Sequence, residues 1–235
     1  APASAPAEPA AAASPDHSKF DALLGKYVTP EGKVNYKAWK ASADDMKALD
    51  TYVAWVSTAD ATKMEKMDAL AFWINGYNAI TIQAVLASYP EFPGVLKVDG
   101  FFDKIKRKAG GEELTLNDLE KLKVREPYGE PRIHFVVNCA SVSCPVILPE
   151  ALTKDNLEES MESAAKKYVL QETKLSDDKK TVDTSHIFDW YKDDFKPAGG
   201  VNAFLAKYMA EADREAVKTA TVTFHDYDWN LNEAK

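Results

Sequence analysis

Residues 131–145 (PRIHFVVNCASVSCP) hold the greatest concentration of reactive side chains, including both cysteines of the chain and one of its four histidines. A cysteine close to a histidine can form the thiolate–imidazolium pair of a covalent catalyst, because the thiolate is the attacking species. We therefore expect one of the two cysteines, Cys139 or Cys144, to be the nucleophile and His134 to be its general base and acid.

Spacing alone does not decide which cysteine meets the histidine. In an extended strand, His134 and Cys139 would lie about 17 Å apart and point to opposite faces. They can meet only if the chain turns between residues 138 and 142, and such a turn would also bring Cys144 back toward His134. A helical turn that began at Pro145 would lower the pKa of the Cys144 thiol.

Other interpretations of the cysteine pair remain open. In an oxidising compartment Cys139 and Cys144 could form a disulfide, because a tightly turned segment can bring their Cα atoms close enough. They could equally be two inert buried thiols, and His134 a hydrogen-bonded core histidine. A redox role has less support, since the spacing is not C-x-x-C.

Buried polar side chains near this segment could bind a substrate. Asn75 and Asn78 lie three residues apart on one face of an apolar helix, where a buried amide must be hydrogen-bonded. They either form a structural amide network or donate to an oxyanion in a polar cleft. We expect the substrate-binding residues to be Asn75, Asn78, Asn138, Arg132 and Ser141, with Asn75 or Asn138 as the oxyanion donor.

A carboxylate behind His134 would complete a triad by fixing the tautomer of the histidine. Glu120 is the candidate, although three other acidic residues nearby are equally eligible from spacing alone. The other histidines and the acidic residues between 189 and 228 have neither zinc nor calcium spacing, so we assign no metal. The chain contains no P-loop, G-x-G-x-x-G or G-x-S-x-G motif, and we assign no cofactor.

The elements expected to position these residues are mostly helices. The apolar run of residues 64–88 predicts a central buried helix, and residues 133–138 (IHFVVN) are apolar and β-branched, which predicts a buried strand. The other expected elements are a hairpin across 101–116, a capped helix at 115–123, a helix from 153 or 155 to 170, a hairpin at 174–182, helices at 185–194 and 201–209, and a strand at 220–224. This order predicts a helix-rich α+β domain with a small, largely antiparallel sheet.

Composition narrows the class of protein. The 235 residues are 46% hydrophobic and carry a net charge of −8. These values are typical of a globular domain, and the acidic balance argues against nucleic-acid binding. The chain contains no run of 18 apolar residues, so its sequence does not predict a membrane-spanning segment.

The first fifteen residues differ from the rest, because they contain eight alanines and four prolines. This composition predicts a disordered or polyproline-II-like tether over residues 1–15, with residues 16–235 as a single globular domain. Such tethers often follow a removed leader peptide, so we expect a periplasmic or secreted protein.

Several segments together resemble a bacterial and plant family catalogued as domain of unknown function 547. They are residues 71–79 (AFWINGYNA), 116–120 (LNDLE), 131–145, 185–195 (SHIFDWYKDDF) and 227–232 (YDWNLN). The resemblance gives weight to Glu120, His134 and Cys139, which fall on its motifs. The stretch after His134 also resembles the histidine strand of phytochelatin-synthase and other papain-like enzymes. Because both cysteines follow the histidine here, that likeness implies a circularly permuted papain-like arrangement.

These observations predict an exported cysteine-nucleophile enzyme that cleaves or transfers a peptide or amide bond of a small peptide or thiol-containing peptide. In it, Cys139 attacks, His134 transfers the proton and Glu120 orients the histidine. The alternative is a non-catalytic periplasmic binding or interaction domain with a structural Cys139–Cys144 disulfide. A protein partner is compatible with either function.

Overall fold

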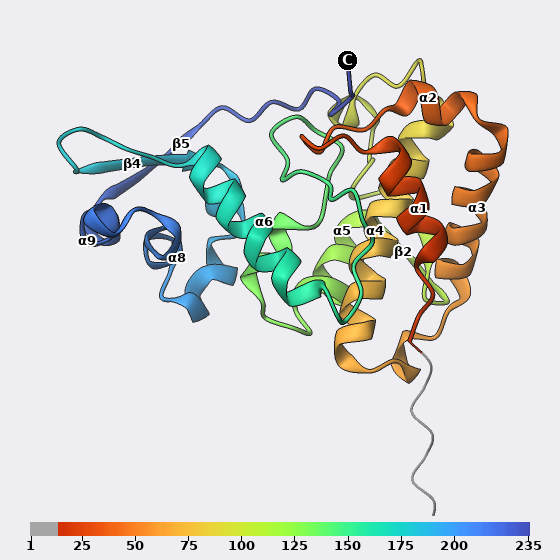
Figure 1. Cartoon of the computed structure of the whole chain (residues 1–235), viewed down its shortest axis with the longest axis horizontal. Helices are drawn as coiled ribbons and strands as arrows, with labels where there is room; N and C mark the ends of the chain where they lie inside the picture. The colour runs from red at the N-terminus through yellow and green to blue at the C-terminus, as the bar shows by residue number, and fades with distance from the viewer. Residues whose placement is uncertain (1–13) are drawn as a thin grey trace, which may run out of the picture.

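The computed structural model describes residues 14–235, so residues 1–13 of the predicted tether lie outside the described residues. Within the described part, the helix-rich α+β class is confirmed (Figure 1). The N-terminal half contains α1 (Ser18–Tyr27), α2 (Tyr36–Ala41), α3 (Ala43–Thr58), η1 (Ala61–Lys63), α4 (Lys66–Ser88), η2 (Val95–Lys97), β1 (Arg107–Ala109), β2 (Glu112–Leu114), α5 (Leu116–Asp118) and η3 (Leu119–Arg125). The second half contains η4 (Pro131–Phe135), α6 (Leu157–Glu172), β3 (Lys174–Leu175), β4 (Thr181–Ser185), α7 (Ile187–Trp190), η5 (Lys192–Ala198), α8 (Val201–Tyr208), η6 (Glu211–Asp213), α9 (Arg214–Thr219) and β5 (Thr221–His225). Here η marks a 3-10 helix, except that η3 is a π-helix.

Helix α4 is the centre of the N-terminal half and confirms the predicted buried helix. It is apolar on nearly every face, and such a helix is stable only when protein surrounds it. Gly76 has no Cβ, and a Cβ built there would lie only 3.0 Å from Cγ1 of Val56. This glycine therefore lets α3 pack closely against α4.

Two small sheets accompany the helices. Strands β1 and β2 form the expected antiparallel hairpin across Gly110 and Gly111, with Gly110 in the left-handed region at φ +60°. Next comes the predicted capping box, in which Thr115 and Asp118 satisfy each other's backbone N–H groups. The second sheet has the order β3-β4-β5, with β3 antiparallel and β5 parallel to β4.

The prediction of a strand over residues 133–138 is wrong. Residues 131–135 form the 3-10 helix η4, and the chain then continues as a loop. The side chain of Asn78 replaces a neighbouring strand, since its Nδ2 donates to the Val136 carbonyl over 2.9 Å and its Oδ1 accepts from the Asn138 N–H over 2.9 Å. A short apolar run is buried equally well in either conformation, so its composition could not separate them.

The chain after β5 connects the two sides of the molecule. In Figure 1 it runs from the β4–β5 sheet on the left back to the helices α1–α3 on the right. There the Val34 N–H donates to the Asn232 carbonyl over 3.0 Å, and Leu231 forms a bridge with Ser141. This late segment therefore contacts both the N-terminal helices and the cysteine-containing loop.

Two further observations concern the termini and the helices. Ser14, which belongs to the predicted tether, donates a hydrogen bond from Oγ to Oδ2 of Asp68 over 3.1 Å. None of the helices in residues 14–235 has the length and apolar character needed to cross a membrane.

Candidate active site

A cavity of about 190 Å³ brings together the four residues predicted to be catalytic. Glu120 from η3, His134 from η4, and Cys139 and Cys144 from the following loop all line it. Most other lining side chains are aromatic, namely Tyr77, Phe102, Trp190, Tyr191, Tyr227 and Trp229. The cavity is smaller than a typical drug-sized pocket, which fits a small ligand group.

The Cys139 thiol is half-buried and surrounded by hydrogen-bonding groups. Its Sγ lies 3.0 Å from Oγ of Ser141 and 3.6 Å from the hydroxyl of Tyr227. Burial raises the pKa of the Cys139 thiol, but hydrogen bonds from Cys144, Ser141 and Tyr227 outweigh it and lower the pKa to about 7. These hydrogen bonds favour the thiolate of Cys139, which makes it the more reactive cysteine.

Cys144 plays a supporting part. It is buried, its Sγ accepts a hydrogen bond from the Cys139 N–H over 2.9 Å, and both cysteines are free thiols. Burial and the neighbouring Cys139 raise the pKa of Cys144 well above its ordinary value. Within the described residues no helical turn begins at Pro145, so the condition for a lowered Cys144 pKa is not met.

The imidazole of His134 is held by a carboxylate that the sequence did not single out. Its Nε2 lies 2.8 Å from Oδ2 of Asp194, and the same oxygen accepts from Nε of Arg125 over 2.7 Å. Although partial burial opposes ionisation, these two partners hold the pKa of Asp194 far below its ordinary value. Asp194 is therefore an ionised acceptor to which Nε2–H of His134 donates, and this tautomer leaves Nδ1 as the nitrogen that can accept a proton.

Glu120 does not orient His134, which corrects the sequence-based assignment. It is buried, and its Oε1 lies 3.9 Å from Nη1 of Arg125. The orienting role falls to Asp194 because η5 folds back against η4 from sixty residues further along the chain. The signal for Asp194 was its place in the 185–195 segment, one of those that carry the family resemblance. No hydrogen bond joins His134 to either cysteine within residues 14–235.

The three asparagines predicted to bind substrate hold the backbone instead. Asn75 exchanges two hydrogen bonds with the Leu152 backbone, and Asn78 joins Val136 to Asn138. The side chain of Asn138 donates to the Pro145 carbonyl over 2.8 Å and accepts from the Ala140 N–H over 2.9 Å. None of the three asparagines lines the cavity, so Asn75 and Asn138 are not placed to donate to an oxyanion there. This was the structural alternative considered from the sequence.

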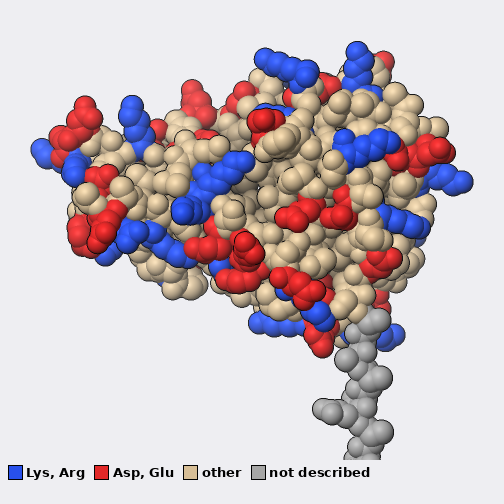
Figure 2. All heavy atoms as spheres, viewed as in Figure 1, with Lys and Arg blue, Asp and Glu red and all other residues tan. Residues whose placement is uncertain are grey.

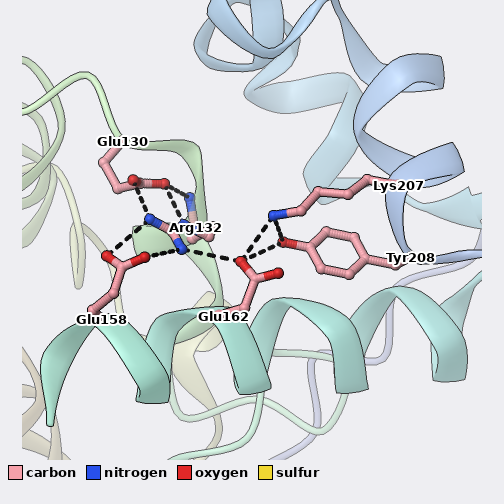
Figure 3. A network of polar contacts seen from close by, with 6 residues as sticks. All are labelled: Glu130, Arg132, Glu158, Glu162, Lys207 and Tyr208. Carbon is pink, nitrogen blue, oxygen red and sulfur yellow. Dashed lines mark hydrogen bonds and ion pairs between the residues drawn. The ribbon is translucent and has the colours of Figure 1, made fainter.

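Arg132 does not line the cavity and belongs instead to the network of polar contacts drawn in Figure 3. Its guanidinium donates to the carboxylates of Glu130, Glu158 and Glu162. Glu162 in turn accepts from Lys207, so the network joins η4, α6 and α8. With its donors taken by carboxylates, Arg132 is a structural residue rather than a substrate ligand.

Ser141 and an aromatic cluster complete the site. Ser141 is buried beside Cys139 and interacts with the Tyr227 hydroxyl over 3.4 Å. The rings of Trp190, Tyr227 and Trp229 lie 4.6–5.6 Å apart, centroid to centroid, and Trp190 is about half exposed. This cluster lines the cavity. On the face of the molecule shown in Figure 2, charged side chains of both signs are interspersed.

Comparison with known proteins supports the family resemblance. Residues 61–169 match the model of the family described as "Protein of unknown function, DUF547". The matched part contains Glu120, His134 and both cysteines, whereas Asp194 and Tyr227 lie beyond it. Neither the curated proteins nor the solved structures compared with the chain gave a match, and the papain-like resemblance gains no support from these comparisons.

Proposed function

We propose that this protein is a cysteine-nucleophile enzyme that cleaves or transfers the acyl group of a peptide or amide bond in a small peptide. One observation carries the proposal: the Cys139 thiol, with a pKa of about 7, shares a cavity with a histidine that Asp194 holds in the base tautomer. A nucleophile, a base and an orienting acid are the parts that acyl transfer by covalent catalysis needs.

The chemistry follows from the protonation states. The Cys139 thiol passes its proton to Nδ1 of His134, and the thiolate attacks the carbonyl carbon. The tetrahedral intermediate expels the amine, which takes the proton from Nδ1, and a thioester remains on Cys139. Water or a second amine then attacks the thioester, with His134 accepting a proton and returning it to the sulfur. Catalytic hydrogen bonds are often long in the free enzyme, so the His134–Cys139 contact is expected to tighten with substrate bound.

Tyr227 is the best placed donor for the oxyanion. Its hydroxyl lies 3.6 Å from Sγ of Cys139, and its ring lines the cavity. Burial and the two cysteines raise the pKa of Tyr227 far above its ordinary value. Tyr227 therefore stays protonated at neutral pH, and its hydroxyl can donate a hydrogen bond to a negative oxygen that forms beside the sulfur.

A covalent adduct on Cys139 is the direct test. We would incubate the protein with dipeptidyl chloromethyl ketones and with a panel of peptidyl aminomethylcoumarins, and follow mass and fluorescence. We expect alkylation of Cys139 and release of coumarin, loss of both in Cys139→Ser, and slower but continued reaction in Cys144→Ser, because Cys144 supplies one of the hydrogen bonds that lower the pKa of Cys139. Absence of turnover, together with alkylation no faster than that of a free peptide thiol, would refute the proposal.

A non-catalytic binding domain is the second candidate, and the absence of a His134–cysteine hydrogen bond within residues 14–235 favours it. In that case the aromatic cavity would hold a ligand without reacting with it. The pH profile of iodoacetamide alkylation separates the two functions. A midpoint near the ordinary thiol value of about 8.5 supports the binding domain, and a midpoint near 7 supports the enzyme.

A further inference from the structure

Glu120 brings a carboxylate into the cavity with one oxygen unpaired. The residue is 7% exposed and lines the cavity. Its Oε1 is buried and has no hydrogen-bond partner in residues 14–235. Buried polar atoms are almost always paired, so an unpaired carboxylate oxygen at a cavity points to a donor that arrives with a ligand.

Within residues 14–235 no lysine or arginine lines the cavity beside Glu120, so a cationic ligand could pair with its carboxylate. Arg125 lies behind it, with Nη1 3.9 Å from Oε1 of Glu120, but its Nε donates to Asp194 over 2.7 Å. Two carboxylates thus share one guanidinium, and Arg125 gives Glu120 no hydrogen bond at this distance.

The aromatic part of the cavity lining is suited to the same kind of ligand. The faces of Trp190, Tyr227 and Trp229 are electron-rich, and tryptophan and tyrosine faces attract ammonium groups through their quadrupoles. Carboxylate and aromatic faces in one small cavity favour an ammonium over a neutral or anionic group.

We propose that the cavity selects a substrate with a cationic amine, an N-terminal or side-chain ammonium close to the bond that Cys139 attacks. Oε1 of Glu120 accepts a hydrogen bond from this ammonium. As a statement about substrate, this inference rests on the proposed function, whereas the preference of the cavity for cations does not.

Methanethiosulfonates of different charge measure this preference without a known substrate. The Cys139 thiolate attacks their sulfenyl sulfur, forms a mixed disulfide and releases methanesulfinate. We would compare the rates of the 2-aminoethyl (cationic) and 2-sulfonatoethyl (anionic) reagents at Cys139, each divided by its rate with a free peptide thiol. Peptide mapping by mass would assign the reaction to Cys139.

We expect the cationic reagent to react about tenfold faster than the anionic one after this correction, because a buried carboxylate acts strongly at short range. Glu120→Gln should bring the ratio close to one. The matched control is Glu126→Gln, which makes the same charge change at a side chain that is 57% exposed, next to the end of the same helix η3. It should leave the ratio unchanged.

A ratio near one in the wild-type protein overturns the inference, whatever the variants do. An equal fall in Glu126→Gln also overturns it, because the preference would then come from surface charge. Repeating the wild-type measurement in 0.5 M salt covers the case that Glu120→Gln does not fold. A buried interaction keeps its ratio there, and loss of the ratio would contradict us.

The outcomes also separate this inference from the proposed function. A cationic preference without any acyl adduct on Cys139 would support the cation site and refute the proposed enzymatic function. An acyl adduct without charge preference would do the reverse.

Discussion

Nε2 of His134 donates a hydrogen bond to Oδ2 of Asp194 over 2.8 Å, although the two residues are 60 positions apart in the chain. The ring of His134 also lies 4.1 Å, centroid to centroid, from that of Tyr191. Bond and ring contact together fix the position and tautomer of the imidazole. Its free nitrogen is then the only one that can accept a proton from a thiol.

Asp194→Asn should reduce acylation of Cys139 by roughly 10²-fold or more, because an amide no longer stabilises the imidazolium and can hold the wrong tautomer. Single-turnover kinetics with a chromogenic peptide would measure this. Asp193→Asn is the matched control, since Asp193 is 72% exposed and pairs with Lys196. Equal rates in the two variants would remove Asp194 from the mechanism.

Tyr227→Phe should raise the pKa of Cys139 above 7, because it removes a hydrogen bond that lowers this pKa. The thiolate fraction at pH 7 then falls, and iodoacetamide reacts more slowly at neutral pH but not at pH 10. Stopped-time alkylation between pH 5 and 10 measures the midpoint. Tyr128→Phe changes a half-buried tyrosine outside the cavity and should leave the midpoint in place.

His17 should make stability depend on pH. It is 4% exposed, and burial lowers its pKa to about 4 from an unfolded value of 6.5. Between these values the unfolded chain binds a proton that the folded chain does not, so the free energy of unfolding falls as pH falls from 6.5 to 4. The loss amounts to at most about 3 kcal/mol.

Urea unfolding at pH 7.0, 5.5 and 4.5 would measure this effect as the difference between the wild-type protein and His17→Gln. The variant should lose less stability across the window, because glutamine does not titrate. His186→Gln replaces a more exposed histidine and serves as control. A wild-type slope no steeper than that of His17→Gln would show that His17 does not contribute.

Arg132→Met should lower the free energy of unfolding by about 1–3 kcal/mol, because it leaves Glu130 without its partner and breaks the link between η4 and α6. The alkylation rate and midpoint of Cys139 should stay as in the wild-type protein, since Arg132 does not line the cavity. Reduced reactivity in a fully folded variant would instead return Arg132 to the site.

The sequence was most informative where a local rule is strict. The length and apolar character of α4, the hairpin at Gly110 and the capping box of Thr115 with Asp118 were all predictable from neighbouring residues. The residues 133–138 were not, because Asn78 supplies the hydrogen bonds that a neighbouring strand would supply. Rules of periodicity consider only residues that are near in the chain, so they cannot predict a hydrogen bond from the side-chain amide of a distant helix.

The candidate site divides in the same way. His134, Cys139 and Cys144 lie close together in the chain, and their residue types identified them as candidate catalytic residues. Asp194 and Tyr227 were hidden, because they reach the cysteine loop only through tertiary packing, and Tyr227 lies 88 positions from Cys139. Glu120 was placed correctly at the cavity but given the wrong partner, since spacing cannot rank several nearby carboxylates.

The segment after β5 has a consequence for biosynthesis. Tyr227 approaches Cys139, and Asn232 donates from Nδ2 to Oδ1 of Asn138 over 3.1 Å. A ribosome makes these residues some ninety positions after the cysteine loop. Until they emerge, the nascent chain lacks Tyr227, one of the groups that lower the pKa of Cys139. The thiol should therefore gain its full reactivity only late in synthesis, which spares the growing polypeptide an active nucleophile.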